Sequence, residues 1–545
     1  MLATMTFTAG SHLLGGSLFL SAMAGLLPLL VFFVLLGAFG VKTHWCAIIS
    51  LGVSLLVAVL GFKMPVTYAL LAGTEGIALG LMPILYIIIA AVWLYNLTER
   101  SGRSADVRMA FNLVGKGDQR VLALLIGFSF CGLLEGLAGF GAPVAIVAAI
   151  LVTVGFDPIK AAILTIVGNA INVGFGAIAI PVTTPATSVG LEPATVAAQM
   201  GHITPFIAAF VPMILLVIAD GMRGLKQLWP AALLVGAVTA GSHYWVTNFF
   251  TYELTAVIAS LLGLASIAIL MQFWTPTTPD DVKADKAEGL TASRAALGLM
   301  PYWLVVIVFG VAKLWKIGVD LPALLKSTDY KFGWPGLDGN LLTAAGEPVK
   351  ATTFTLSTLN SPGTLIILTA IIVSIVYGAT SSGGKYPFSF GQGMKLLPTT
   401  IYNLRIAILT ISTIMALAFV MNLSGQTGAI GLWMAGAGTA FVFISPVLGW
   451  IGTAVTGSAT SAGALFAGLQ NTAAMQIGAD PNLLVGANAI GGGIGKIVSP
   501  QNLAIASGAI GKEGAEPELL RKAAPISAAL LVVLCLIVGL TSTLS

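Results

Sequence analysis

Charged side chains are scarce in this sequence, since only 8% of its 545 residues are Asp, Glu, Lys or Arg. Soluble proteins carry about 25% charged residues, which keep their surfaces hydrated. Hydrophobic residues make up 57% of the chain, and the mean hydropathy is +0.98. These values exclude an ordinary soluble enzyme and predict an all-α polytopic membrane protein surrounded by a lipid bilayer.

Cysteine and histidine are also rare, with three Cys and four His along the whole chain. Neither residue type recurs at a metal-binding or haem-binding spacing, so we expect no metal site and no cofactor. The sequence contains no nucleotide P-loop, no GxGxxG after a strand and no HExxH motif. A net charge of +4 on so long a chain does not predict a nucleic-acid partner. The protein is therefore not expected to be an enzyme.

The N-terminal region lacks Lys and Arg before Lys42, so it does not resemble a signal peptide, and its hydrophobic run is expected to be retained. Two apolar stretches, 121–155 and 429–476, are interrupted by small and polar residues and are interpreted as hairpins, either re-entrant or double-pass. The chain otherwise predicts about 12 full spans. These lie near 22–40, 45–61, 76–97, 160–181, 204–219, 229–247, 253–272, 299–315, 362–380, 404–422, 483–508 and 525–543.

The positive charges test this arrangement. If the N-terminus is outside and the spans alternate, most of the 25 Lys and Arg residues fall on the cytoplasmic side. This bias requires each interrupted stretch to return to the side on which it started. It does not separate re-entrant hairpins from pairs of full passes.

Two segments far apart in the chain resemble each other. Residues 168–181 read GNAINVGFGAIAIP, and residues 487–500 read ANAIGGGIGKIVSP. Each follows a Gly-rich interruption, LEGLAGFGAP at 134–143 and TGSATSAGA at 456–464. With the predicted topology the two units run in opposite directions.

The sequence therefore predicts an inverted repeat with halves 1–290 and 291–545. In each half the hairpin and the broken span (160–181 or 483–508) belong to a transport domain. Secondary transporters with this plan bind substrate at the bilayer midplane, where helix N-termini suit an anion. The alternative is that the Gly-rich stretches are only helix-packing motifs.

Two ionisable residues lie within these predicted interruptions. Glu135, at the tip of the first hairpin, could take up and release a proton, or it could be a structural carboxylate. Lys496, in the second broken span, could hold a substrate carboxylate, or it could be an ion-paired or snorkelling Lys. We expect Glu75 and Glu253, at span ends, to be interfacial.

Small and neutral polar residues surround the same interruptions. They could hydrogen-bond a hydroxyl group next to a carboxylate, although each alone could equally join helices. With Glu135 and Lys496 they complete the candidate site for substrate and proton: Gly139, Gly141, Asn169, Asn172, Thr456, Ser458, Thr460, Ser461, Asn488, Ser499 and Gln501.

Several longer motifs resemble the L-lactate permease family of bacterial proton symporters. They are GFSFCGLLEGLAGFGAPVAIVAAILVTVGFDP (127–158), GAIAIPVT (176–183), NLLVGANAIGGGIGKIVSPQNLAIA (482–506), MPVTYALLAG (64–73) and AAVWLYNLT (90–98). The resemblance implies uptake of L-lactate, D-lactate or glycolate with a proton across the bacterial inner membrane. It also implies an elevator motion, with Glu135, Lys496 and Gln501 at the family's motif positions. A homodimer is an open expectation.

The sequence departs from the family pattern at the second hairpin and the first broken span. Members typically read GSDTSSNALF at the second hairpin, whereas this chain reads GSATSAGALF. Ala459 therefore stands where an Asp is usual, and Gly463 where an Asn is usual. The broken span reads NAINV rather than a pattern close to NTAPV. The departures imply coupling through Glu135 alone, a different coupling, or another substrate.

The sequence therefore predicts a secondary active transporter for a small 2-hydroxy monocarboxylate, with a proton as the coupling ion. One alternative is a carrier of the same fold for another organic anion, or one driven by sodium. Less favoured alternatives are an anion channel, which would need rings of charge, and an intramembrane enzyme, which would need a catalytic pair or metal.

Overall fold

The structure is a computed structural model. It describes residues 6–10, 16–37, 39, 41–137, 139, 141–283, 290–312, 321–342, 349, 352–359, 361–512 and 514–544. Most of these residues are helical. The strands are short: β1 (Phe7–Thr8) pairs in parallel with β3 (Leu341–Leu342), and β2 (Tyr330–Gly333) pairs antiparallel with β4 (Thr353–Leu356).

Among the described residues of the first half, the structure has α-helices together with shorter π- and 3-10-helical segments. In chain order they are α1 (Leu18–Gly37), α2 (Thr43–Leu56), η1 (Val57–Gly61), α3 (Val66–Leu79), η2 (Gly80–Leu85), α4 (Tyr86–Arg100), α5 (Ser104–Val114), α6 (Gln119–Leu122), η3 (Ala123–Phe130), α7 (Cys131–Leu137), α8 (Ala142–Thr153), α9 (Pro158–Asn169), η4 (Ala170–Phe175), α10 (Gly176–Ser188), α11 (Pro193–Ala208), α12 (Val211–Phe249), η5 (Tyr252–Leu254), α13 (Thr255–Phe273) and η6 (Asp280–Val282).

The second half continues with α-helices and short 3-10 segments. They are α14 (Ala292–Gly298), α15 (Met300–Ala312), α16 (Leu321–Leu325), η8 (Lys326–Thr328), α17 (Pro362–Ala379), α18 (Phe390–Asn403), α19 (Arg405–Ser424), α20 (Gln426–Ala435), α21 (Ala440–Thr456), α22 (Ala459–Ile477), α23 (Pro481–Gly495), η10 (Lys496–Val498), α24 (Pro500–Ala509) and α25 (Glu516–Leu544). The β2–β4 sheet lies between α16 and α17 in the chain.

Within the described residues, 10 helical stretches are long and apolar enough to cross a membrane, or up to 11 if the bent pair α14–α15 counts as one span. The chain is thus a multi-pass membrane protein. The sequence predicts about 12 spans, and the numbers differ at identifiable places. The stretch Pro193–Phe249 has 57 residues, which is about 85 Å of helix at about 1.5 Å per residue. That length is far more than one crossing of a hydrocarbon core about 30 Å thick, so it comprises two passes.

The numbers differ in three ways. Two predicted spans fall within one stretch, the predicted span 483–508 is not counted, and Gln119–Leu137, predicted as part of the first hairpin, is counted as a span. Asp220 and Gly221 have non-helical φ and ψ and divide α12 between the two predicted spans 204–219 and 229–247. The predicted span 483–508 is instead divided into α23 and α24, which are each too short to be counted alone. The ends of the predicted spans 22–40 and 299–315 lie outside the described residues.

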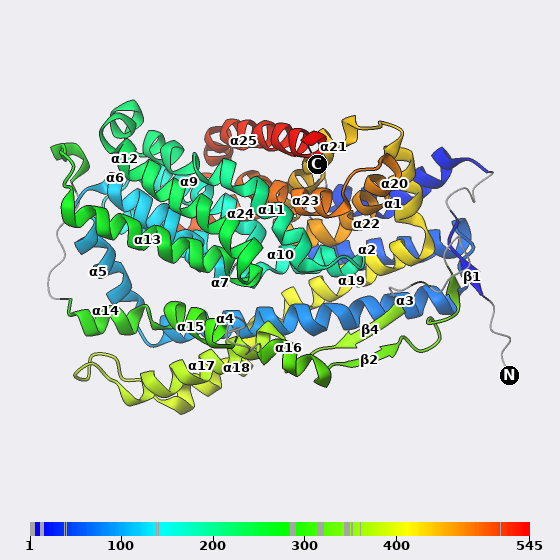
Figure 1. The fold of residues 1–545 in the computed structure, drawn as a ribbon, viewed down its shortest axis with the longest axis horizontal. Helices are drawn as coiled ribbons and strands as arrows, with labels where there is room; N and C mark the ends of the chain where they lie inside the picture. The colour runs from blue at the N-terminus through cyan, green and yellow to red at the C-terminus, as the bar shows by residue number, and fades with distance from the viewer. Residues whose placement is uncertain are drawn as a thin grey trace.

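Figure 1 shows the helices in two layers. The core layer contains α6–α13 and α21–α25, in which α23 packs against α21, α22 and α11. The flanking layer contains α3–α5 and α14–α18, in which α4 packs against α17 and α18. Helix α19 connects the layers, because it packs against α2 and α3 and also against α22.

The two similar sequence segments are preceded by the same local structure. Gly155 and Gly478 follow a helix with φ of +97° and +72°, values that glycine adopts readily. The side chain of Asp157 then accepts a hydrogen bond from the backbone N–H of Lys160, and Asp480 does the same from Asn482. A proline follows each Asp at the first helical turn. The shared sequence GxDP therefore ends one helix and caps the next.

The two broken spans cross each other closely at the centre of the core layer. A Cβ atom added to Gly493 of α23 would lie 2.3 Å from the carbonyl oxygen of Ala170 in η4. Any side chain at this position would therefore push the two spans apart. Part of the glycine excess in the sequence serves this close approach.

A cluster of charges fixes α5 outside the spans. The buried Asp106 carboxylate accepts hydrogen bonds from Arg294 and from the Tyr386 hydroxyl at 2.7 Å, with Lys385 at 3.9 Å. Burial raises the pKa of Asp106. The hydrogen bonds from Arg294 and Tyr386 and the charges of Arg294 and Lys385 outweigh burial, and the pKa lies below its ordinary value. These contacts of Asp106 join α5 to α14 through Arg294, and to the segment between α17 and α18 through Tyr386 and Lys385.

Candidate functional site

The first hairpin brings Glu135 into the core layer. Helix α7 carries Glu135 and ends at Leu137, and α8 begins at Ala142. Gly139 and Gly141 lie between the two helices with φ of +55° and +84°. The backbone therefore reverses at the Gly-rich interruption that the sequence predicts, and the Glu135 side chain is buried at 2% exposure.

The first broken span lies directly against this carboxylate. Asn169, at the end of α9, donates its side-chain N–H to Glu135 Oε2 at 2.8 Å. After η4 the chain makes a left-handed turn at Ala177, Ile178 and Ala179, with φ of 44°, 59° and 57°. A Cβ atom on the preceding Gly176 would lie 2.9 Å from Glu135 Oε1. Glycine at this position therefore lets the broken backbone approach the carboxylate.

The second hairpin turns between α21 and α22. Gly457 has a φ of +73°, and the Ser458 hydroxyl then accepts a hydrogen bond from the backbone N–H of Ser461 at 3.2 Å. Thr456 donates its hydroxyl to the carbonyl oxygen of Gly452 at 2.7 Å. These polar side chains stabilise the end of one helix and the start of the next.

The second broken span places Lys496 in the 3-10 turn η10. The Ser499 side chain accepts a hydrogen bond from the backbone N–H of Asn502 and caps α24. Asn502 in turn donates its amide to the carbonyl oxygen of Lys496 at 3.1 Å. The backbone around Lys496 is thus held by its own neighbours, which leaves the ammonium group available for another partner.

That partner is Glu135. Lys496 Nζ donates to Glu135 Oε1 at 2.8 Å, and the two side chains are only 7% and 3% exposed. The pair joins residues 361 positions apart in the chain. Sequence reasoning singled out both groups but gave them separate tasks, whereas the structure joins them directly. Each charge neutralises the other, and surrounding side chains cover most of both groups.

A cavity of about 270 Å³ lies beside this ion pair. Several predicted site residues line it: Glu135, Gly139, Ser458, Thr460, Lys496 and Gln501. The remaining lining residues are Val173, Gly176, Ala177, Pro181, Leu404, Ala407, Gly457 and Ala459. Gln501 is exposed, so the cavity opens at this residue.

Other predicted site residues do not line this cavity. Asn169 contributes through Glu135, whereas Asn488 donates to Gln470 Oε1 at 2.7 Å and joins α23 to α22. Asn172 is buried at 2% exposure. Gly141, Thr456, Ser461 and Ser499 shape the turns and helix starts around the cavity. Their predicted contact with substrate stays a prediction.

Sequence reasoning did not select the apolar wall of the cavity. Leu404 is the N-cap residue of α19, and Ala407 lies in the first turn of that helix. Both are far from the Gly-rich motifs, and nothing in the local sequence distinguishes them from lipid-facing residues. Val173, Ala177 and Pro181 lie inside a motif that was selected, although only its polar residues were assigned to the site. The missing information is the packing of α19 against the core layer.

Glu75 and Glu253 are both covered by protein, at 1% and 8% exposure. Helix α19 packs against α3, which carries Glu75, and Glu253 in η5 lines a crevice together with residues of α4 and α17. Their expected position at the membrane interface stays a prediction. Hydropathy locates the end of a span but does not show which helices cover it.

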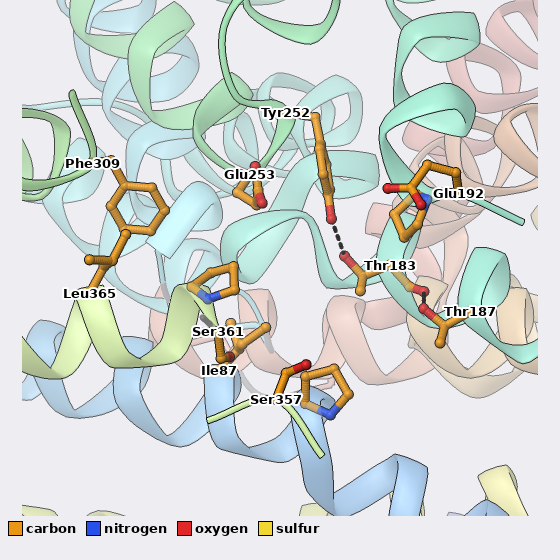
Figure 2. A pocket seen from close by; sticks show the side chains of 13 residues that line it. Ile87, Thr183, Thr187, Glu192, Tyr252, Glu253, Phe309, Ser357, Ser361 and Leu365 are labelled. Atoms are coloured by element: carbon orange, nitrogen blue, oxygen red, sulfur yellow. Dashed lines mark hydrogen bonds between the residues drawn. The ribbon is translucent and has the colours of Figure 1, made fainter. Parts of the chain in front are cut away.

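A second crevice of about 320 Å³ lies between α10 and η5 on one side and α4 and α17 on the other. Figure 2 shows Thr183 directed toward Tyr252, and their oxygen atoms are 3.4 Å apart. Glu192 and Glu253 also line the crevice, and no Lys or Arg is among its described lining residues. This chemistry does not suit an anion as well as the cavity beside Lys496 does.

Chemically, the cavity beside Lys496 offers one acid, one ammonium group, two hydroxyls and one amide. It could bind a small carboxylate and exchange a proton at Glu135. Among the described residues, no group of three or more His, Cys, Asp or Glu side chains is placed to hold a metal ion. The structure thus combines apolar helices of membrane-spanning length with interrupted helices, a buried ion pair and a small cavity. This combination is typical of a membrane transport protein.

Comparison with known proteins identifies the family. The family model described as L-lactate permease matches residues 21–545. The chain is 34% identical to the L-lactate permease of Bacillus subtilis over 98% of both chains. It is 36% identical to the glycolate permease and to the L-lactate permease of Escherichia coli, over 93% of each chain. The chain therefore belongs to the L-lactate permease family, and it is a transporter rather than an enzyme.

Two solved transporter structures show a weaker likeness. The YdaH transporter of Alcanivorax borkumensis is 16% identical, with 84% of each chain covered and a TM-score of 0.43. MtrF of Neisseria gonorrhoeae is also 16% identical, with 93% of this chain and 96% of MtrF covered and a TM-score of 0.48. Both TM-scores are below 0.5, so the fold is described from this chain's own helices and not from these two structures.

Proposed function

We propose that the protein imports L-lactate, D-lactate and glycolate across the bacterial plasma membrane together with a proton. The names of the relatives support this substrate class. The small cavity suits an acid of this size, and its hydroxyl and amide groups could bond a 2-hydroxyl next to a carboxylate. The observation that carries the proposal is the buried ion pair between Glu135 and Lys496.

The ion pair explains how proton and substrate would be coupled. In the empty site Glu135 neutralises Lys496 at 2.8 Å. Protonation of Glu135 ends this pairing and leaves the Lys496 ammonium group unpaired in a buried position. A substrate carboxylate then replaces the Glu135 carboxylate at Lys496. Both the empty site and the fully loaded site carry no net charge.

A site that has bound only the proton or only the substrate carries a net charge, and this charge opposes its movement across the membrane. A proton without substrate leaves a net positive charge, and a substrate without a proton leaves a net negative charge. Moving a buried charge through the hydrocarbon region costs several kcal/mol, estimated at about 2.5–3.5 kcal/mol or more. Only the empty and fully loaded forms cross readily, which is the requirement for symport.

The layered arrangement suggests which part moves. The hairpins 121–155 and 429–476 and the broken spans 160–181 and 483–508 form the transport domain. It slides as an elevator against helices of the flanking layer, with the N-terminus outside. A crossing of this kind would carry the ion pair and the cavity together. Halves 1–290 and 291–545 form the inverted repeat, and assembly as a homodimer is part of the same proposal.

Proteoliposomes test the proposed function. We expect labelled lactate and glycolate to accumulate when the lumen is more alkaline than the bath, and uptake to saturate with substrate. A sodium gradient without a pH gradient should give no accumulation. Accumulation that requires sodium would contradict proton coupling. Uptake that does not saturate, accompanied by ionic current, would indicate a channel instead.

A further inference from the structure

The cavity beside the ion pair combines two chemically different walls. The polar side chains of Glu135, Lys496, Ser458, Thr460 and Gln501 all come from the hairpins and broken spans. The same elements also contribute small apolar side chains at Val173, Ala177, Pro181 and Ala459. Leu404 and Ala407 instead come from the N-cap and first turn of α19, a helix outside both repeat motifs. Any molecule that fills this cavity contacts both kinds of surface.

The two α19 residues form one surface. They are three positions apart, so they lie on the same face of a helix start. Both are partly exposed to the cavity, whereas Ile406 between them is 49% exposed on the outer surface of the helix. Neither side chain can donate or accept a hydrogen bond, so this wall offers van der Waals contact and nothing else.

We propose that Leu404 and Ala407 determine which 2-hydroxy acids are carried, by limiting the length of the group at carbon 2. This inference rests on the proposed function. The carboxylate and hydroxyl of such an acid are alike in glycolate, lactate and 2-hydroxybutyrate. The polar wall therefore holds the common part of the molecule. The group that differs is hydrogen, methyl or ethyl, which is apolar and finds its contact at Leu404 and Ala407.

Contact with this wall makes it selective. The cavity of about 270 Å³ is larger than an acid of six heavy atoms, so in this proposal Lys496 and the hydroxyl groups fix the position of the acid, and its group at carbon 2 meets the side chains of Leu404 and Ala407. One methyl or methylene group in an apolar pocket changes discrimination by about 10–200-fold. Small changes in the side chains at positions 404 and 407 should therefore shift the substrate preference without removing transport.

Two opposite substitutions test the inference. Ala407→Leu fills part of the cavity, and we expect the ratio of lactate to glycolate uptake to fall about tenfold or more. Leu404→Ala enlarges it, and we expect 2-hydroxybutyrate uptake to rise relative to lactate by a similar factor. Initial uptake rates of the labelled acids into proteoliposomes, each over a range of concentrations, give the ratios.

Matched variants separate selectivity from damage. Ile406→Phe adds bulk to the exposed face of the same helical turn and should leave every ratio unchanged. Ala407→Val repeats the narrowing test with a smaller addition if the leucine variant does not fold. Active variants at 404 and 407 with the ratios of the parent protein would overturn the inference. A parent protein that carries neither lactate nor glycolate would instead overturn the proposed function, and the inference with it.

Discussion

The two broken spans share a sequence pattern but differ in the groups they present. Their constant offset aligns Ala177 with Lys496, and both residues line the cavity. Ala177 begins a left-handed turn with a φ of 44°, whereas Lys496 begins a right-handed 3-10 turn. Equivalent positions thus carry a methyl group on strained backbone in one span and an ammonium group on relaxed backbone in the other.

The aligned asparagines show the same division. Asn169 donates to the Glu135 carboxylate, and Asn488 donates to the Gln470 amide oxygen. Each asparagine therefore bonds a side chain of its own hairpin, but only one of these side chains is charged. The repeat supplies two similar frameworks, and the chemistry is concentrated where the acid of the first meets the base of the second.

Loss of the ion pair should give the largest effect. Lys496→Ala leaves the Glu135 carboxylate buried and unpaired and removes the proposed partner of the substrate. Breaking a buried pair in this way costs about 3–5 kcal/mol, so we expect uptake to fall more than 100-fold. Ala177→Gly changes the position in the first broken span that is equivalent to Lys496. We expect this variant to have no comparable effect on uptake.

Glu135→Gln tests the other half of the pair. We expect the variant to lose proton-driven accumulation, measured as lactate uptake under an imposed pH gradient, because the amide can neither neutralise Lys496 nor bind an exchangeable proton. Exchange of lactate across the membrane at equal pH should persist at a reduced rate. Unchanged proton uptake alongside lactate would contradict the proposed role of Glu135.

The asparagines should separate transport from stability. Asn169→Ala removes a hydrogen bond to Glu135, so we expect uptake to fall about tenfold and its pH dependence to shift, at about 1.4 kcal/mol per tenfold change. Asn488→Ala leaves the buried Gln470 oxygen without its donor, which costs about 1–3 kcal/mol of stability. It should lower the melting temperature and leave the pH dependence of uptake unchanged. Equal behaviour of the two variants would remove the functional distinction between the spans.

The two broken spans also differ in backbone strain, which should appear as opposite effects of glycine substitutions on stability. A left-handed conformation costs an L-residue about 1–2 kcal/mol, so we expect Ala177→Gly to stabilise the protein by about 0.5–1 kcal/mol after the entropy of glycine is included. Ala489→Gly, in right-handed α23, should destabilise by about 1 kcal/mol. Thermal unfolding of both variants in one detergent gives the comparison. A lower melting temperature for Ala177→Gly would contradict the strain argument.

The smallest effect is expected at the Asp106 cluster, outside both broken spans. Because the folded pKa of Asp106 lies below its ordinary value near 4, its contribution to stability is fully present above about pH 4 and is lost as the pH falls through the folded value. Asp106→Asn should therefore lower the melting temperature at neutral pH. The pH profile of uptake between pH 5 and 8 should keep its shape.

Much of the fold could be predicted from the sequence, because hydropathy locates spans and glycine marks the places where they break. The predicted interruptions at Gly141 and Gly457 are present as turns, and the helix starts at the two GxDP sequences became apparent only in the structure. The candidate site was predicted only in part. Glu135 and Lys496 were found because ionisable residues are rare in spans, but their pairing depends on two elements 361 positions apart.

The part of the apolar wall formed by Leu404 and Ala407 could not be predicted at all. Leu404 and Ala407 look like any residues at the start of a membrane helix, and their role depends on where α19 packs. The burial of Glu75 could not be predicted for the same reason, because α19, the helix that packs against α3, lies elsewhere in the chain. Contacts between distant elements depend on the shapes of both surfaces, and a pattern within one segment describes only its own.

The volume of the cavity also limits the number of water molecules that it can hold. A volume of about 270 Å³ holds on the order of nine water molecules at about 30 Å³ each. A transporter that returns empty would carry at most this amount across the membrane per cycle, and a bound acid would displace several of these molecules. In the proposed cycle, the water carried with each molecule of acid would therefore be limited to what this cavity holds.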